Sequence, residues 1–216
     1  MKRLVAISIL ILLVLSVFIF PLDQYGSSVF YVSLAFFMCA LFAASWKGGI
    51  AKGLEYLGLK FRKKDVPRLL TQSFILLCAC GLVTVALSGI FMLLGILDTD
   101  KVYGKVVQLP AQALVLAFTL APLGEEAMFR GLLFKKLGEW LRPKLKGEMP
   151  WIAAAVVSSA IFALLHASYG SVAELGVAFV VGIVLCIGVK KTGSLVPSVL
   201  AHAAFNFASI AMAVFL

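Results

Sequence analysis

The chain has 216 residues, of which 62% are apolar and only 13% are charged, and its mean hydropathy is +1.08. A soluble core of this length cannot use so much apolar surface, so most of the chain must lie in lipid. The composition therefore excludes nucleic-acid-binding modules, soluble nucleotide-binding folds and disulfide scaffolds. The net charge of +9 is first a sign of membrane orientation rather than of an anionic partner.

Seven apolar runs follow one another along the chain, separated by short polar or charged segments. They cover residues 4–22, 27–46, 69–97, 107–134, 151–168, 171–189 and 195–216. A helix needs about 20 residues to cross the hydrocarbon core, so the sequence predicts an all-α polytopic membrane bundle of about seven transmembrane helices. We expect one integral membrane domain over residues 1–216. The first run lacks a small-residue cleavage site and is long for a signal peptide, so we expect it to be a retained span.

The basic residues predict the orientation of this bundle. Of the 19 lysines and arginines, 16 lie at the amino terminus or in three alternate segments, namely 46–69, 135–150 and 190–191. The opposite segments hold only Lys101 and Lys105. Cytoplasmic loops carry the excess of basic residues, so we expect a multi-pass cell-membrane protein with a cytoplasmic amino terminus. Segments 46–69 and 135–150 also contain aromatic residues and leucines, which fits either short helices in the headgroup region or ordinary solvated loops.

Polar residues inside the predicted spans need a partner or a task, because a charge at mid-bilayer costs roughly 2.5–3.5 kcal/mol on insertion scales. Both histidines of the chain belong to this group. Its members are Glu125, Glu126, Arg130, His166, Glu174, His202 and Asn206. Glu174 lies near the outer end of its span, where an interfacial position is sufficient explanation. The four cysteines, in contrast, lie in apolar runs, and we expect small buried apolar side chains rather than ligands.

The spacing of these residues predicts which of them meet. Glu126 and Arg130 are four apart on a helix and can form an internal ion pair. Glu125 lies about 140° from Arg130 around the helix, so it is left free to act as a base. His202 and Asn206 share one helix face, and the Phe162 ring can pack on His166 at the same interval of four. Interhelical hydrogen bonding alone is the competing explanation for each polar residue.

Three motifs in this part of the chain resemble a known family. Glu125 to Arg130 has the form EExxxR, Phe162 to His166 has the form FxxxH, and His202 to Asn206 has the form HxxxN. Their order on successive hydrophobic segments is similar to that of the CPBP intramembrane proteases, which include the type II CAAX prenyl endopeptidases and bacterial proteins linked to bacteriocin self-immunity. The resemblance covers about residues 107–216, the expected catalytic core, and leaves 1–106 as accessory spans.

The resemblance implies a role for each motif residue. Glu125 and His166 would polarise a water that attacks the scissile carbonyl, and His202 and Asn206 would stabilise the resulting oxyanion. Glu126, Arg130 and Phe162 would have structural or positioning roles. The implied reaction is endoproteolysis of a membrane-associated or lipidated protein or peptide, with the lipid bilayer as the other partner and no organic cofactor. The oligomeric state, the substrate and its cleavage site are not implied.

Three alternatives accompany this hypothesis. Glu125, His166 and His202 form a two-histidine, one-glutamate set of the kind that catalytic Zn²⁺ or another divalent metal uses, although a glutamate-activated water without metal is favoured. A catalytically silent scaffold or bacteriocin-immunity protein that binds another membrane protein is a second possibility. A proton-coupled transporter is a third, but the chain has no inverted repeat.

The depth of the site in the membrane can be estimated from helical rise. Glu125 lies about 15 Å from Lys135 and His202 about 16 Å from Lys191, which predicts a pocket among spans four, five and seven that opens to the cytoplasmic side. His166 is about 24 Å from Pro150 on the same count. The fifth helix must therefore start outside the membrane, be tilted or broken, or have another boundary.

Overall fold

The structure is a computed structural model that describes residues 27–46 and 48–215. Within these residues every regular element is a helix. The helices are α2 (Ser27–Ser45), α3 (Gly49–Leu57), η1 (Lys63–Asp65), α4 (Val66–Leu93), α5 (Thr99–Val106), α6 (Ala111–Phe118), α7 (Leu120–Glu126), η2 (Ala127–Phe134), α8 (Lys135–Leu141), α9 (Met149–Leu164), η3 (Leu165–Tyr169), α10 (Val172–Thr192) and α11 (Val196–Phe215). The all-α membrane bundle predicted from the sequence is confirmed.

Several of these helices are long and apolar enough to cross a membrane. Four in the described residues qualify, namely Lys63–Leu93, Met149–Tyr169, Val172–Thr192 and Val196–Phe215, and two sharply bent helix pairs raise the number to six if each pair is one span. The predicted first span, 4–22, lies outside the described residues. The total of seven crossings and the division into accessory and catalytic parts therefore remain predictions.

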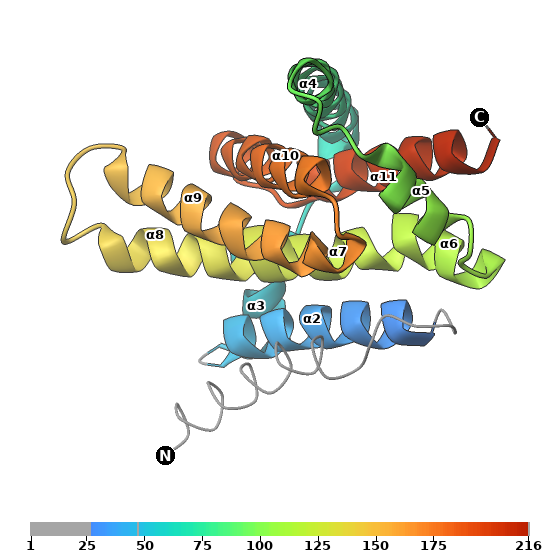
Figure 1. Cartoon of the computed structure of the whole chain (residues 1–216). Helices are drawn as coiled ribbons and strands as arrows, with labels where there is room; N and C mark the ends of the chain where they lie inside the picture. Colours follow the sequence, from blue (N-terminus) through green and yellow to red (C-terminus); the bar gives the residue numbers. More distant parts are fainter. Residues whose placement is uncertain (1–26, 47, 216) are drawn as a thin grey trace.

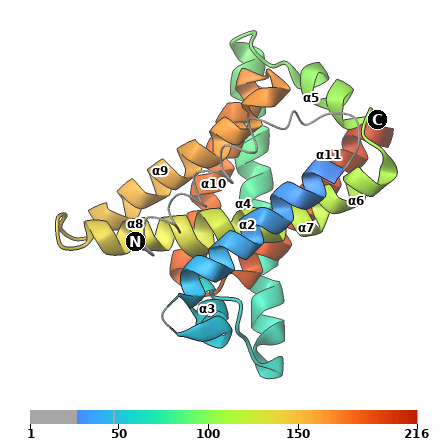
Figure 2. The same ribbon diagram turned by 90° about the horizontal axis from the view of Figure 1, so that it is seen from below.

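The helices are stacked in layers (Figure 1). A line formed by α6, α7, η2 and α8 runs through the middle with α9 beside it, α2 packs on one side of this line, and α10 and α11 lie on the other side beneath α4. Seen from below, α2 crosses in front of α7 (Figure 2). Large apolar side chains on α4 are exposed, including Leu82, Val85 and Leu93. Exposed apolar surface of this extent is expected where a helix faces lipid.

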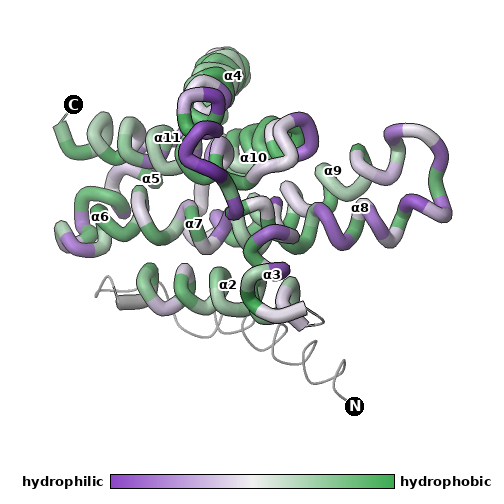
Figure 3. The backbone as a smooth tube through the Cα atoms, turned by 180° about the vertical axis from the view of Figure 1, so that it is seen from behind, coloured by the Kyte–Doolittle hydropathy of each residue, from purple (hydrophilic) through white to green (hydrophobic). Residues whose placement is uncertain are grey.

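The end of the fourth run differs from the sequence prediction, and the structure also shows what the basic segments form. The fourth apolar run was expected to end at 134, but the helix continues through α8 to Leu141. The Lys135 ammonium donates a hydrogen bond to the Tyr56 carbonyl at 2.7 Å, so a basic residue that suggested a loop instead stays in the helix. Of the two basic segments, the first contains a short helix, α3, bent by 111° from α2. The second begins within α8, and Figure 3 shows hydrophilic residues gathered in the loop that follows.

The end of the bundle that carries the basic segments is tied together by backbone contacts. Gly58 ends α3 with φ of 83°, a conformation that favours glycine. Its carbonyl accepts hydrogen bonds from the Leu195 amide at 2.9 Å and from the Ser194 hydroxyl at 3.1 Å. The turn between α3 and α4 therefore lies against the turn between α10 and α11.

Candidate active site

The buried ion pair at the centre of the bundle is formed by Glu126 at the end of α7 and Arg130 in η2. Arg130 Nη1 donates to Glu126 Oε1 at 2.8 Å, and both side chains are 0% exposed. The pair predicted from the four-residue spacing is confirmed. The guanidinium also lies 4.2 Å from the centroid of the Phe162 ring, so part of its charge is stabilised by an aromatic face.

His202 on α11 joins this pair and was not expected there. Its Nδ1 lies 2.9 Å from Glu126 Oε1, and the residue is only 5% exposed. A carboxylate paired with arginine can only accept a hydrogen bond, so Nδ1 must carry a proton and donate it. The other ring nitrogen, Nε2, points away from the Glu126–Arg130 pair. The Glu126 carboxylate thus fixes the orientation of the imidazole, as a carboxylate does for the histidine of a catalytic triad.

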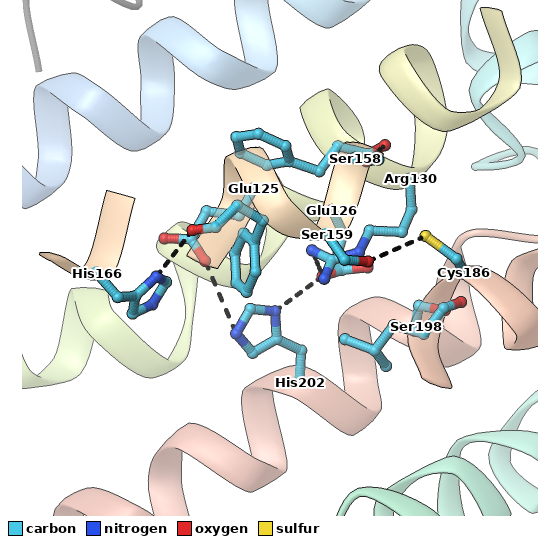
Figure 4. Close-up of polar contacts among 12 residues, drawn as sticks. Glu125, Glu126, Arg130, Ser158, Ser159, His166, Cys186, Ser198 and His202 are labelled. Carbon is cyan, nitrogen blue, oxygen red and sulfur yellow. Dashed lines mark hydrogen bonds and ion pairs between the residues drawn. The ribbon is translucent and has the colours of Figure 1, made fainter. Parts of the chain in front are cut away.

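Glu125 lies next to the free nitrogen of His202. Its Oε2 is 3.7 Å from His202 Nε2, and its side chain is 22% exposed. That separation is too long for a direct hydrogen bond, and a water placed to one side of the two atoms could contact both. In Figure 4 the Glu125 carboxylate points toward the gap between the rings of His166 and His202. The two adjacent glutamates therefore have different partners, as the sequence predicted.

His166 is positioned by a change of helix type. The α-helix α9 ends at Leu164, and His166 lies in the 3₁₀ turn η3 that follows. Its Nδ1 is 3.1 Å from the Phe162 carbonyl, and the predicted packing on Phe162 is confirmed by a ring separation of 4.8 Å. Phe162 also lies 5.9 Å from the His202 ring, so both imidazoles flank one phenyl ring. The break lies only two residues before His166, so nearly all of the chain between Pro150 and His166 is ordinary α-helix.

Asn206 lies one turn beyond His202 on α11. Its amide Nδ2 donates to the Ala117 carbonyl near the end of α6 at 2.9 Å. The amide nitrogen carries two hydrogens, so one remains for another acceptor. Thr119 separates α6 from α7 and has irregular backbone angles (φ −115°, ψ −74°). The Asn206 hydrogen bond therefore joins α11 to α6, the part of this broken helix that precedes the break.

A cavity of about 240 Å³ adjoins these residues. His166, His202, Asn206 and Phe162 all line it, whereas Glu125 is not among its lining residues. Glu174, for which the sequence suggested only an interfacial position, also lines this cavity. The cavity is built from the ends of helices opposite to the basic segments. The expected opening of the site to the cytoplasmic side stays a prediction.

Small residues around the ion pair were missed by the sequence analysis. The Ser158 hydroxyl on α9 donates to the Phe129 carbonyl in η2 at 2.8 Å. A Cβ atom at Gly182 would lie 2.9 Å from Ser159 and 3.0 Å from Arg130 Nη2, so only glycine leaves room for the guanidinium. The sequence signal was small residues within otherwise apolar helices, which commonly mark close helix contacts in membranes.

The described residues do not gather a metal-binding set. A Zn²⁺ ion would need Glu125, His166 and His202 to converge as three donors at about 2.0–2.2 Å from one point. Across residues 27–46 and 48–215, no group of three or more His, Cys, Asp and Glu side chains is arranged to hold an ion. The geometry of these three side chains thus does not fit the metal alternative. The four cysteines are free thiols, with Cys80 and Cys186 buried in helix contacts.

Comparisons with known proteins bear on the same region. An uncharacterized 24.3 kDa protein of Escherichia coli is 27% identical over 139 residues, which cover 56% of this chain and 57% of the relative. The chain therefore spans little more than half the length of that relative. No solved structure matches. The family model described as type II CAAX prenyl endopeptidase Rce1-like matches residues 107–208, which include all three motifs. This segment is thus similar to the Rce1-like type II CAAX prenyl endopeptidases, and the family resemblance predicted from the motifs is confirmed.

Proposed function

We propose that this protein is an intramembrane endopeptidase that hydrolyses a peptide bond of a membrane-associated protein or peptide with a water activated by Glu125. The observation that carries the proposal is the separation of 3.7 Å between Glu125 Oε2 and His202 Nε2, next to a cavity lined by both histidines. A water that contacts both atoms from one side has a carboxylate to take its proton. The similarity of residues 107–208 to the protease family supports the same reaction.

The proposed reaction passes through a tetrahedral intermediate, with Glu125 carrying one proton. The water oxygen bonds to the scissile carbonyl carbon while one water proton passes to the Glu125 carboxylate. The tetrahedral intermediate then collapses, the carbon–nitrogen bond breaks, and the same proton passes from Glu125 to the leaving amine. His166 assists in polarising the water. No step requires a cofactor, and the site's own groups hold every proton.

His202 and Asn206 are proposed to stabilise the oxyanion. Asn206 contributes the amide hydrogen that Ala117 does not use. His202 can donate from Nε2 only when both ring nitrogens are protonated, because Nδ1 already donates to Glu126. Removal of one oxyanion donor typically lowers kcat by about 10²–10³-fold, which sets the expected effect of Asn206→Ala.

The test compares cleavage of a membrane-anchored peptide library by the purified wild type, Glu125→Gln and His166→Ala, each with and without a chelator. We expect Glu125→Gln to lower the rate by at least about 10²–10⁴-fold, the usual contribution of a positioned base, and the chelator to have no effect. Glu55→Gln is the matched control, because Glu55 is exposed and pairs only with Lys60.

Two results would contradict the proposal. Cleavage by Glu125→Gln at the wild-type rate would exclude this residue as the base and leave the alternative of a non-catalytic membrane scaffold or immunity protein. Loss of wild-type cleavage on adding the chelator, restored by Zn²⁺, would establish the metal alternative instead.

A further inference from the structure

The turn that carries His166 is held by side chains from another part of the chain. His166 lies in η3, which is followed by Gly170 with φ of 73°. The carbonyls at the end of a helix have no donor within that helix. Lys105 on α5 donates to the Ser168 carbonyl, and Lys101 on α5 donates to the Gly170 carbonyl at 3.2 Å. Two lysines of α5 thus supply donors that the end of the helix lacks.

A third contact joins the residue before α5 to the start of α10. The Ser171 hydroxyl donates to Asp98 Oδ1 and accepts a hydrogen bond from the Glu174 amide at 3.0 Å, so it also caps α10. Asp98 Oδ2 in turn pairs with Lys101 at 3.0 Å. These contacts, here called the α5 attachment, join Asp98, Lys101 and Lys105 to Ser168, Gly170 and Ser171.

The held turn determines where the His166 ring lies. The ring contacts Phe162 of α9 at 4.8 Å and stacks with Tyr169 of η3 at 6.1 Å between ring centroids. Ser168, which Lys105 contacts, lies between His166 and Tyr169 in the sequence. A displacement of this carbonyl would therefore move both rings of the stacked pair.

The contacts of the two lysines are exposed, and exposed contacts of this kind add little to global stability. Helix ends, however, open locally at little cost in free energy, and a 3₁₀ turn has poorer hydrogen-bond geometry than an α-helix. A small energy is therefore enough to change the fraction of molecules in which η3 is ordered. The α5 attachment should affect His166 without much effect on global unfolding.

The helix α5 also leads to the other half of the site. The chain continues from α5 into α6, whose Ala117 carbonyl accepts the hydrogen bond from Asn206. On the way, Val102 and Val106 of α5 line the same cavity as His166. The position of α5 is thus shared between the turn that carries one proposed catalytic side chain and the helix that holds another.

From these observations we infer that Lys105 is a positioning residue of the active site, which acts through the Ser168 carbonyl to hold His166 in place. This inference rests on the proposed function and adds to its site a residue outside the three motifs. Lys101 and Asp98 support the same turn through Gly170 and Ser171.

The first experiment observes His166 directly and does not depend on activity. The chain has two histidines, so selective isotope labelling of histidine gives two sets of NMR signals for the detergent-solubilised full chain, which His166→Ala assigns. In Lys105→Met we expect the His166 ring signals to move toward the values of a free histidine, because the ring leaves its aromatic neighbours. The His202 signals should not move, since Glu126 holds that ring.

Two further variants serve as controls for the NMR measurement. Lys105→Arg keeps a cationic donor for the carbonyl and should retain the wild-type His166 signals. Lys64→Met removes an exposed lysine before α4, at the other end of that helix from α5, and should leave both histidines unchanged. Unchanged His166 signals in Lys105→Met would overturn the inference.

The second experiment measures kcat and KM for one peptide that wild type cleaves from the membrane-anchored library. We expect Lys105→Met to lower kcat by about tenfold, less than the roughly 10²-fold cost of a full 1 Å misplacement, and to leave KM near the wild-type value. Lys105→Arg should restore kcat, and Lys64→Met should not change it. The unfolding temperature of all three variants should stay close to that of wild type.

The outcomes separate this inference from the proposed function. A raised KM with unchanged kcat would mean that α5 acts in substrate binding, and shifted His166 signals with wild-type kcat would mean that the attachment has no catalytic role; either result overturns the inference alone. If wild type cleaves no peptide, the proposed function fails and the catalytic role of Lys105 fails with it, while the NMR signals still show whether α5 holds the turn.

Discussion

At the level of single residues, the central feature is that one carboxylate oxygen, Glu126 Oε1, serves both Arg130 and His202. The contact with Arg130 follows from helical periodicity and was predictable. The contact with His202 was not, because it depends on the register between α7 and α11, which no local spacing determines. Sequence reasoning therefore found the participants but placed Glu126 only as a helix-positioning residue.

The buried ion pair predicts a large loss of stability when one partner is removed. Arg130→Met leaves Glu126 as an uncompensated charge in a site that is 0% exposed. Removing one partner of such a pair costs about 3–5 kcal/mol. We expect a marked fall in the unfolding temperature of the detergent-solubilised protein, and a partial recovery in the double variant Glu126→Gln/Arg130→Met.

The control for this prediction is Arg62→Met, which breaks the pair between Arg62 and Asp65. Those side chains are 73% and 35% exposed, and exposed pairs contribute only about 0–1 kcal/mol. If Arg130→Met and Arg62→Met shift the unfolding temperature equally, the central pair is not a stabilising element of the fold.

At the level of elements, α2 and α7 are in close backbone contact. A Cβ atom at Gly124 would lie 2.2 Å from the carbonyl oxygen of Ser33, a backbone atom that cannot rotate away. We expect Gly124→Ala to force the two helices apart and to cost about 1–3 kcal/mol, the usual range for overpacking. Thermal unfolding in detergent measures the change.

Gly81 on α4 provides the matched substitution. A Cβ atom there meets nothing within 4 Å, and alanine is favoured over glycine within a helix by about 0.5–1 kcal/mol. Gly81→Ala should therefore be neutral or stabilising. A destabilisation of the same size in both variants would mean that the contact between α2 and α7 is not the cause.

The Asp98 carboxylate, just before α5, predicts that the stability of the fold depends on pH. The Ser171 hydroxyl and, next, the Lys101 ammonium hold the pKa of Asp98 below its usual value of 3.8. A carboxylate with a lowered pKa in the folded state adds stability above its unfolded pKa and loses it as the pH falls through the folded value. The unfolding temperature should therefore fall more between pH 6 and pH 3 in wild type than in Asp98→Asn. Parallel curves for the two proteins would exclude this contribution.

The limits of sequence prediction at this level are visible in two elements. The composition of α4, α10 and α11 identified them as spans because hydropathy alone determines membrane insertion. The end of the fourth run and the 3₁₀ turn that carries His166 were not predictable. They depend on a lysine bonded to a distant carbonyl and on a change of helix type that leaves no clear composition signal.

At the level of the whole molecule, the structure predicts that no bound metal contributes to stability. A ligand that binds only the folded state raises its stability by RT ln(1 + [L]/Kd), so removal of a resident metal would lower the unfolding temperature. Because the described residues bring no three donors together, we expect the same unfolding temperature before and after dialysis against a chelator. A drop that Zn²⁺ reverses would contradict this expectation.

The distribution of charge over the molecule was predictable, whereas the position of the cavity was not. Counting basic residues requires only the sequence. Locating the cavity requires knowing that α5 packs against η3 and α11. Depth estimates from helical rise measured the distance from the basic segments, and they could not show which side of each residue borders a cavity.

The segment η2 (Ala127–Phe134) is π-helical, and this has a consequence for how the chain tolerates length changes. A π-helical turn accommodates one residue more than an α-helical turn. Deleting a single residue such as Leu133 would let this stretch wind as an ordinary α-helix, and the helix after it would keep facing much the same way. Gly138, where a Cβ atom would lie 2.4 Å from Trp151, would still fit against α9. A deletion within the regular helix α8 has no such slack, because it would turn the rest of that helix by about 100° and separate α8 from α9.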